Sequence, residues 1–131
     1  MWAVLTDTKS YSTWADFLVD LQGTICDNCE IDATFQLKPE KEKLLDVHHK
    51  IVVEDGQQFF WSDKYGGGIL DKHLFRVERT ADNQTRFIQS DMAKGGMTWL
   101  LGGTIVKRLL PGYQAFNRSL KVEVEKRYGN E

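Results

Sequence analysis

Alternation of apolar and polar residues dominates the middle of the chain. Ile31, Ala33 and Phe35 alternate with polar residues, which is the pattern of a strand with one buried face. The same period recurs further along, and clear strands are predicted at residues 30–38, 45–54, 57–62, 73–78 and 84–92. Short connections join them, including the hairpin signal Asp55-Gly56, so the sheet is predicted to be antiparallel.

Helical spacing is found at both ends of the chain. Residues 1–5 and 10–14 fit two short helical segments, whereas residues 17–22 fit either a strand or a helix. Towards the C-terminus, apolar residues recur at intervals of four or seven. They are Leu101, Ile105, Leu109, Phe116, Leu120 and Val124. Pro111 is predicted to kink or interrupt this helix, and its second half, residues 113–128, is amphipathic.

Composition narrows the classes of protein to which the chain could belong. Its 131 residues are 41% hydrophobic and 27% charged, which is typical of one globular domain. The net charge of −2 argues against a nucleic-acid binder held by phosphate contacts. No apolar run approaches the roughly 18 residues of a membrane span, and the first residues lack the basic start of a signal peptide.

The two cysteines, Cys26 and Cys29, are too few for a disulfide framework, which indicates a cytoplasmic protein. Their spacing fits a redox pair or half of a zinc site. A zinc site needs two more ligands, and the nearest histidines, His48 and His49, are adjacent and about twenty residues away. We expect the cysteines to flank a turn, with neither a metal nor a cofactor.

Several short motifs, in the order in which they occur, resemble the START-like (SRPBCC) superfamily in its polyketide cyclase/dehydrase-like branch. They are Trp2-Ala3-Val4-Leu5-Thr6-Asp7, Tyr11-Ser12-Thr13-Trp14, Phe17-Leu18-Val19-Asp20-Leu21-Gln22-Gly23, His73-Leu74-Phe75-Arg76-Val77-Glu78, Thr85-Arg86-Phe87-Ile88-Gln89-Ser90, and Gly112-Tyr113, Phe116-Asn117, Leu120-Lys121 and Glu125. The resemblance covers nearly the whole chain and implies a single α+β domain over residues 1–131. The expected fold is a helix-grip: a curved antiparallel sheet of about six strands around a long C-terminal helix, with two short N-terminal helices. It assigns residues 17–22 to a strand.

The sequence departs from the family pattern in a few places. Asp91 stands where Glu is common, Ala93 where a bulky aromatic is common, and Pro111 interrupts the helix. The family's first strand, which lies between the second strand and the last, has no counterpart. An upstream start is the favoured explanation, beside a strand from a partner chain or a different closure of the sheet. As the chain stands, residues 17–22 and 84–92 would be exposed edges, which predicts marginal stability or self-association.

The resemblance also implies an apolar cavity between the sheet and the helix. The sheet residues expected to line it are Phe35, Leu37, Val47, His49, Phe59, Trp61, His73, Phe75, Phe87 and Gln89. The helix residues expected there are Leu101, Ile105, Leu109, Phe116 and Leu120. Such a pocket suits a small hydrophobic ligand, for example a lipid, a polyketide or an isoprenoid. Taken one at a time, these residues also fit a filled core.

Three functions remain open at this point. The favoured one is a module that binds or carries a small hydrophobic molecule. The second is a cyclase- or dehydratase-like enzyme, for which His49, His73, Asp91 and Tyr113 are the acid/base candidates. No nucleophile motif, phosphate loop or metal cluster accompanies them. The third is a protein-interaction module.

Overall fold

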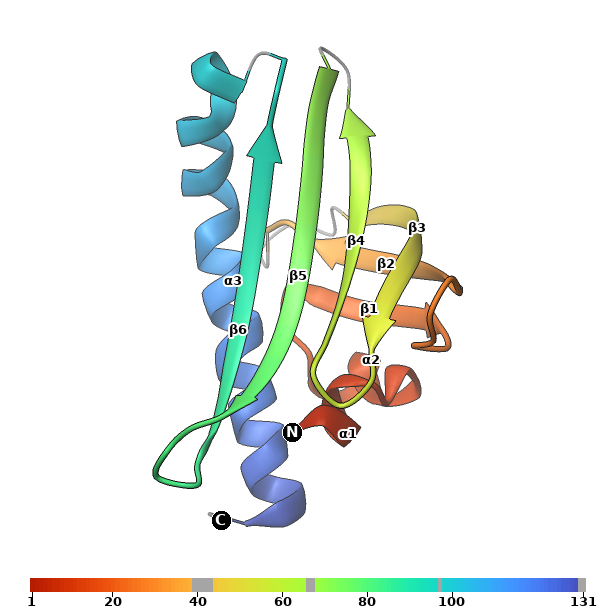
Figure 1. The fold of residues 1–131 in the computed structure, drawn as a ribbon, viewed down its shortest axis with the longest axis vertical. Helices are drawn as coiled ribbons and strands as arrows, with labels where there is room; N and C mark the ends of the chain where they lie inside the picture. Colours follow the sequence, from red (N-terminus) through yellow and green to blue (C-terminus); the bar gives the residue numbers. More distant parts are fainter. Residues whose placement is uncertain (39–43, 66–67, 97, 130–131) are drawn as a thin grey trace.

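The computed structural model describes residues 1–38, 44–65, 68–96 and 98–129. Six strands form one antiparallel sheet in the order β1-β2-β3-β4-β5-β6 (Figure 1). The strands are β1 (Leu18–Gly23), β2 (Glu30–Gln36), β3 (Leu44–Glu54), β4 (Gln58–Tyr65), β5 (Ile69–Arg79) and β6 (Thr85–Lys94). The helices are α1 (Trp2–Leu5), the 3₁₀ turn η1 (Thr8–Ser10), α2 (Tyr11–Trp14) and α3 (Thr98–Tyr128).

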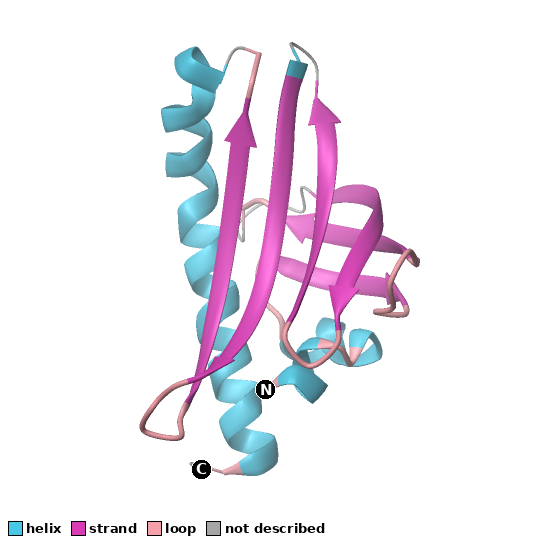
Figure 2. Cartoon of the chain, viewed as in Figure 1, coloured by secondary structure: helices cyan, strands magenta, loops and turns pink. Residues whose placement is uncertain are grey.

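The sheet is strongly curved. In Figure 1, β4, β5 and β6 run along the long axis of the molecule, whereas β1 and β2 cross it and β3 bends between the two directions. Figure 2 shows α3 as one long helix beside this curved sheet, with the short helices at one end. The arrangement is α+β and helix-grip-like, as the sequence predicted, and residues 18–23 form a strand.

The core forms where the inner face of the sheet meets the helices. Alternate residues of β2 are buried, as the two-residue period predicted, and Phe116 and Leu120 of α3 are fully buried in the same core cluster. Tyr11 of α2 belongs to the same cluster, and its hydroxyl donates a hydrogen bond of 2.7 Å to the Leu5 carbonyl. The largest side chains with almost no exposed surface are Tyr11, Phe59, Phe75, Phe116, Leu5, Leu18, Leu21, Ile31, Ile51, Leu120 and Val4.

Helix α3 continues without a break through Pro111, so the interruption predicted from the sequence is absent. Pro111 is exposed, and solvent can hydrate the Lys107 carbonyl that proline leaves without an N–H partner. The next residue, Gly112, packs on the Phe17 ring, where a Cβ atom would lie 2.3 Å from Phe17 Cδ2. Gly112 therefore lets α3 approach the start of the sheet closely.

Two strand edges have no partner in the described parts of the chain. β1 and β6 are the ends of the strand order. The exposed apolar residues Met92, Val106 and Leu110 border a groove of about 670 Å³ beside β6. Self-association through these edges stays a prediction.

A turn at Asp27 and Asn28 lies between the cysteines, as expected, and a disulfide joins Cys26 to Cys29. Asn28 has the left-handed backbone conformation that Asn tolerates well, with φ of 60°. Its N–H donates to the Ile51 carbonyl at 3.0 Å, and the Ile51 N–H donates to the Cys29 carbonyl at 3.0 Å. The turn is thereby fixed to β3, two residues from His49.

Candidate functional site

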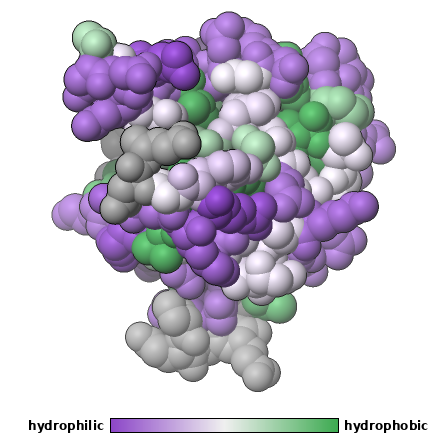
Figure 3. Space-filling view, turned by 90° about the horizontal axis from the view of Figure 1, so that it is seen from below, coloured by the Kyte–Doolittle hydropathy of each residue, from purple (hydrophilic) through white to green (hydrophobic). Residues whose placement is uncertain are grey.

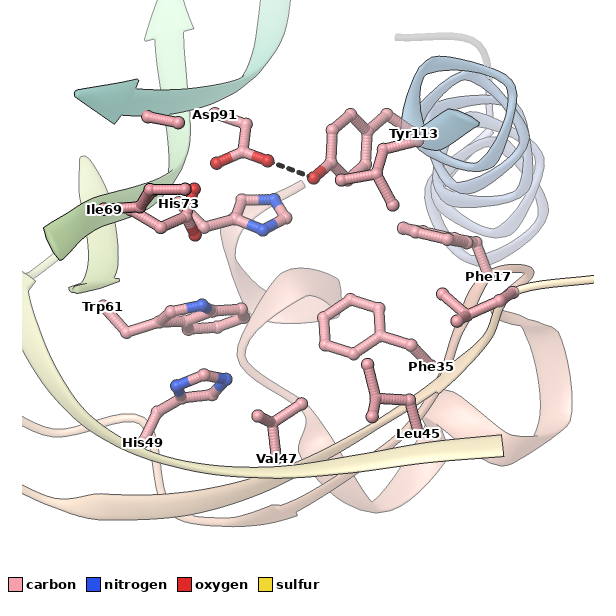
Figure 4. Close-up of a pocket in the computed structure, with 14 residues that line it drawn as sticks. Phe17, Phe35, Leu45, Val47, His49, Trp61, Ile69, His73, Asp91 and Tyr113 are labelled. Carbon is pink, nitrogen blue, oxygen red and sulfur yellow. Dashed lines mark hydrogen bonds between the residues drawn. The ribbon is translucent and has the colours of Figure 1, made fainter. Parts of the chain in front are cut away.

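A cavity of about 340 Å³ lies between the concave face of the sheet and α3 (Figure 4). Its lining residues come from the segment before β1, from strands β2 to β6, from the residue that follows β2, and from the middle of α3. They are Phe17, Phe35, Leu37, Leu45, Val47, His49, Trp61, Ile69, Asp71, His73, Asp91, Ala93, Leu109 and Tyr113. Leu37, Leu45, Asp91 and Ala93 are exposed, so these residues mark where the cavity meets solvent.

Aromatic rings form much of the cavity wall. The ring of Phe17 meets those of Phe35 and Tyr113 edge to face, with centroids 5.3 Å apart in both pairs. Phe17 reaches this position through a left-handed backbone conformation, with φ of 70°. Rings at these separations attract one another beyond the gain from burial, so they hold the wall in a fixed shape.

One buried imidazole, His49, lies at one side of the cavity under Trp61 (Figure 4). The two rings stack with centroids 4.6 Å apart and planes 9° apart. His49 Nδ1 lies 3.0 Å from the Asp63 carboxylate of the neighbouring strand, while Nε2 is buried with no hydrogen-bond partner in the described part of the chain. Burial lowers the pKa of His49, against the opposing effect of Asp63. With Nδ1–H donated to Asp63, Nε2 is a hydrogen-bond acceptor.

The second buried imidazole, His73, is already bonded on its Nε2. The Gln89 amide nitrogen lies 2.8 Å from that atom. The His73 ring also stacks on Phe75, with centroids 4.5 Å apart, and meets Tyr113 edge to face at 5.1 Å. Burial lowers the pKa of His73 to about 4, so the ring is neutral at physiological pH.

Two carboxyl groups meet at the solvent side of the cavity. Asp71 of β5 and Asp91 of β6 share a face of the sheet, because the register pairs Asp71 with Ala93 and His73 with Asp91. The Tyr113 hydroxyl of α3 donates a hydrogen bond to Asp91 Oδ2 (Figure 4). Burial raises the pKa of Asp71 to about 7, together with the hydrogen bond and charge of Asp91 and the charge of Asp63. Near neutral pH, the Asp71 carboxyl group therefore still carries a proton in a large fraction of the molecules.

The structure brings together about half of the residues that the sequence assigned to the cavity. Those at its wall are Phe35, Leu37, Val47, His49, Trp61, His73 and Leu109, with the acid/base candidates Asp91 and Tyr113. Phe59, Phe75 and Phe116 lie in the solid core. Phe87 and Leu120 border another groove, beside Met1, and Gln89 borders the groove between β6 and α3. The side chains of Leu101 and Ile105 lie outside the part that the structure describes.

Several residues at the cavity wall were not among the sequence predictions. They are Phe17, Leu45, Ile69 and Asp71, whereas Ala93 was expected at the cavity mouth because it replaces a bulky aromatic residue of the family pattern. Leu45 and Asp71 could have been found, since Leu45 shares a strand face with Val47, and Asp71 lies two residues before His73. Asp63, which orients His49, carries the same signal because it lies two residues after Trp61. For Phe17 the sequence holds no such signal, because its position depends on its left-handed backbone.

The remaining surface features are less distinctive. The end of the molecule seen in Figure 3 is mainly hydrophilic, with hydrophobic residues in separate patches. In the described ranges, no group of three or more His, Cys, Asp or Glu side chains is arranged to hold a metal ion. None of the helices described is both long and apolar enough to cross a membrane.

No protein-family model matches the chain, and the search of curated proteins found no match.

Proposed function

We propose that the protein binds a small hydrophobic molecule in the cavity between the sheet and α3. The observation that carries this proposal is the cavity itself, about 340 Å³ in volume and walled mainly by aromatic and aliphatic side chains. Small-molecule sites have volumes of roughly 300–1,000 Å³ and combine apolar walls with a few placed polar groups. A cavity at the lower end of that range suits a ligand of one to three rings or a short chain.

Membership of the START-like superfamily is part of the same proposal. It is supported by the order of the elements and by the helix-grip-like arrangement of the sheet and α3. The cytoplasmic location expected from the number of cysteines stays a prediction. A Cys26–Cys29 disulfide is a bond more usual in oxidising compartments, so the redox state of this pair in cells bears on the location.

An enzyme acting on the same ligand is the second candidate function. One observation favours it: His49 has its Nδ1 held by Asp63 and leaves Nε2 without a partner in the described chain, which is the arrangement of an oriented general base. Incubation with the molecule that co-purifies from the native host separates the two functions. A binding protein returns the molecule unchanged, whereas an enzyme converts it and loses about 100-fold or more in rate on His49→Gln.

The binding proposal is tested with N-phenyl-1-naphthylamine, an uncharged dye that brightens in apolar surroundings. Wild-type protein should bind it with saturable fluorescence. Val47→Trp fills the cavity and should weaken binding at least tenfold, about 1.4 kcal/mol. Val52→Trp is the matched control, since Val52 lies on the exposed face of the same strand and should leave the affinity unchanged. Equal dye binding by both variants and the wild type would refute the proposal.

A further inference from the structure

We propose that the ligand of this cavity is a small aromatic amine in its protonated form, with its rings in the cavity and its ammonium group at Asp71 and Asp91. The inference rests on the proposed function and narrows it to one chemical class. It follows from the acidic side chains at the cavity wall, which would repel the carboxylate of a fatty acid.

The charged groups at the cavity wall are all acidic. Asp71 and Asp91 line it, and none of the described lining residues is Lys or Arg. A ligand carboxylate would therefore meet two carboxyl groups and no cation, and like charges in a partly buried site repel strongly. An ammonium group would meet the opposite charge and has the hydrogen atoms that carboxylate oxygens accept.

The surroundings of the two carboxyl groups favour a bound cation, because several negative charges lie close together there. Asp71 faces Asp91 from β6, the Asp63 charge on β4 and His73 on its own strand, and Tyr113 from α3 bonds to Asp91. With a pKa of about 7, Asp71 retains a proton that offsets the repulsion between these acids. A bound ammonium group would supply the same compensation with a full charge and release that proton.

The walls fit the rest of such a ligand. Phe17, Phe35, Trp61 and Tyr113 present aromatic rings to the cavity. Rings pack well against an aromatic body, and their faces attract a cation close to them.

A second polar anchor supports a ligand rich in hydrogen-bond donors. His49 is 4% exposed, lines the cavity opposite Asp91 in Figure 4, and has a partnerless Nε2 acceptor within the described chain. A donor on the far end of the ligand would satisfy that atom, whose burial without a bond is costly.

Three matched compounds test the inference by calorimetric titration: 1-naphthylmethylamine, 1-naphthalenemethanol and 1-naphthoic acid. They share one ring system and differ in a cationic, neutral or anionic group. At pH 8 the amine should bind about tenfold more tightly than the alcohol, and the acid should bind most weakly. Between pH 5.5 and pH 8 the affinity for the amine should rise about tenfold as Asp71 loses its proton, while that for the alcohol stays level.

Charge-removing variants provide the control. Asp71→Asn should abolish the pH dependence of the affinity for the amine and weaken the preference for the amine, which Asp91 alone then supports. Asp32→Asn removes an exposed carboxylate from the outer face of β2 and should change none of the three affinities. Thermal unfolding checks that each variant is folded. If Asp71→Asn does not fold, the pH dependence of amine binding by the wild type tests the inference instead.

The outcomes separate the two proposals. An alcohol that binds the wild type as tightly as the amine at pH 8, or a pH dependence of amine binding that survives Asp71→Asn, would overturn the inference and leave the proposed function standing. Failure of all three compounds to bind would overturn both.

Discussion

The side-chain amide of Gln89 donates a hydrogen bond of 2.8 Å to Nε2 of His73. An amide nitrogen only donates, so this Nε2 carries no proton and the neutral ring holds its proton on Nδ1. The lone pair of His73 is therefore occupied. Of the two buried imidazoles, His49 is the one whose Nε2 is open to a ligand in the described structure.

Acid stability should depend on His73. Its pKa is about 4 in the folded protein and about 6.5 when unfolded, so the unfolded chain binds the extra proton between these values. The stability that neutral His73 provides above pH 6.5 is lost as pH falls towards 4, and the total loss is about 3 kcal/mol. Urea unfolding at several pH values should show this loss in the wild type and a much smaller one in His73→Phe. His48→Gln, at an exposed histidine, should retain it; identical profiles for wild type and His73→Phe would contradict the account.

Asp71 should change the pH dependence of folding stability in the direction opposite to that of His73. Its folded pKa of about 7 lies above its unfolded value, so the stability it provides at low pH is lost as pH rises through 7. Asp71→Asn should therefore be more stable than the wild type at pH 8, and this advantage should disappear towards pH 4. Denaturant midpoints at the two pH values measure the difference. A variant less stable than the wild type at pH 8 would show that the carboxylate is not under strain there.

The contact between Gly112 and Phe17 should tolerate no added methyl group. Gly112→Ala places a Cβ 2.3 Å from the Phe17 ring and should destabilise the protein by about 1–3 kcal/mol, despite the better helix propensity of Ala. Gly103→Ala is the matched control, because a Cβ there meets nothing within 4 Å, and it should stabilise α3 by up to about 1 kcal/mol. Equal effects on the unfolding free energy would mean that the close approach does not exist in solution.

Self-association should occur through the unpaired edge of β6. The Thr80 N–H bonds to the Gln84 carbonyl, so alternate residues from Thr85 onwards direct their backbone groups away from β5. Light scattering after size-exclusion chromatography should show a mass that rises above 15.1 kDa with concentration. Thr85→Pro removes one edge donor without touching the β5 pairing and should reduce the association. A constant monomer mass over a hundredfold range of concentration would rule it out.

Strand faces were the most predictable feature of this chain. Ile31 and Ala33 alternate with polar neighbours and are buried in β2 as expected, because a two-residue period fixes which side chains share a face. Periodicity does not show which part of that face packs against other side chains in the core and which part borders the cavity. Phe75 and His73 share one face of β5, yet Phe75 is in the solid core and His73 is at the cavity.

The polar part of the site was less predictable, because it depends on register and on contacts between distant segments. The sequence identified Asp91 and Tyr113 as acid/base candidates, and their hydrogen bond brings β6 and α3 together. Asp71 and Asp63 were missed, although each lies two residues from a predicted cavity residue. Pro111 does not interrupt α3, because proline is tolerated where the helix faces solvent, and the alternative prediction of a kink stays a prediction.

The central claim, that the cavity holds a small molecule, is tested most directly by magnetisation transfer between a bound ligand and methyl groups in NMR spectra. With 1-naphthalenemethanol, the ring protons should give nuclear Overhauser effects to the methyl groups of Leu45, Val47, Ile69 and Leu109, which line the cavity. Val52 and Val122, which are exposed elsewhere, should give none. Contacts only to methyl groups away from the cavity, such as those of Val52 and Val122, or none at saturating ligand, would contradict the claim.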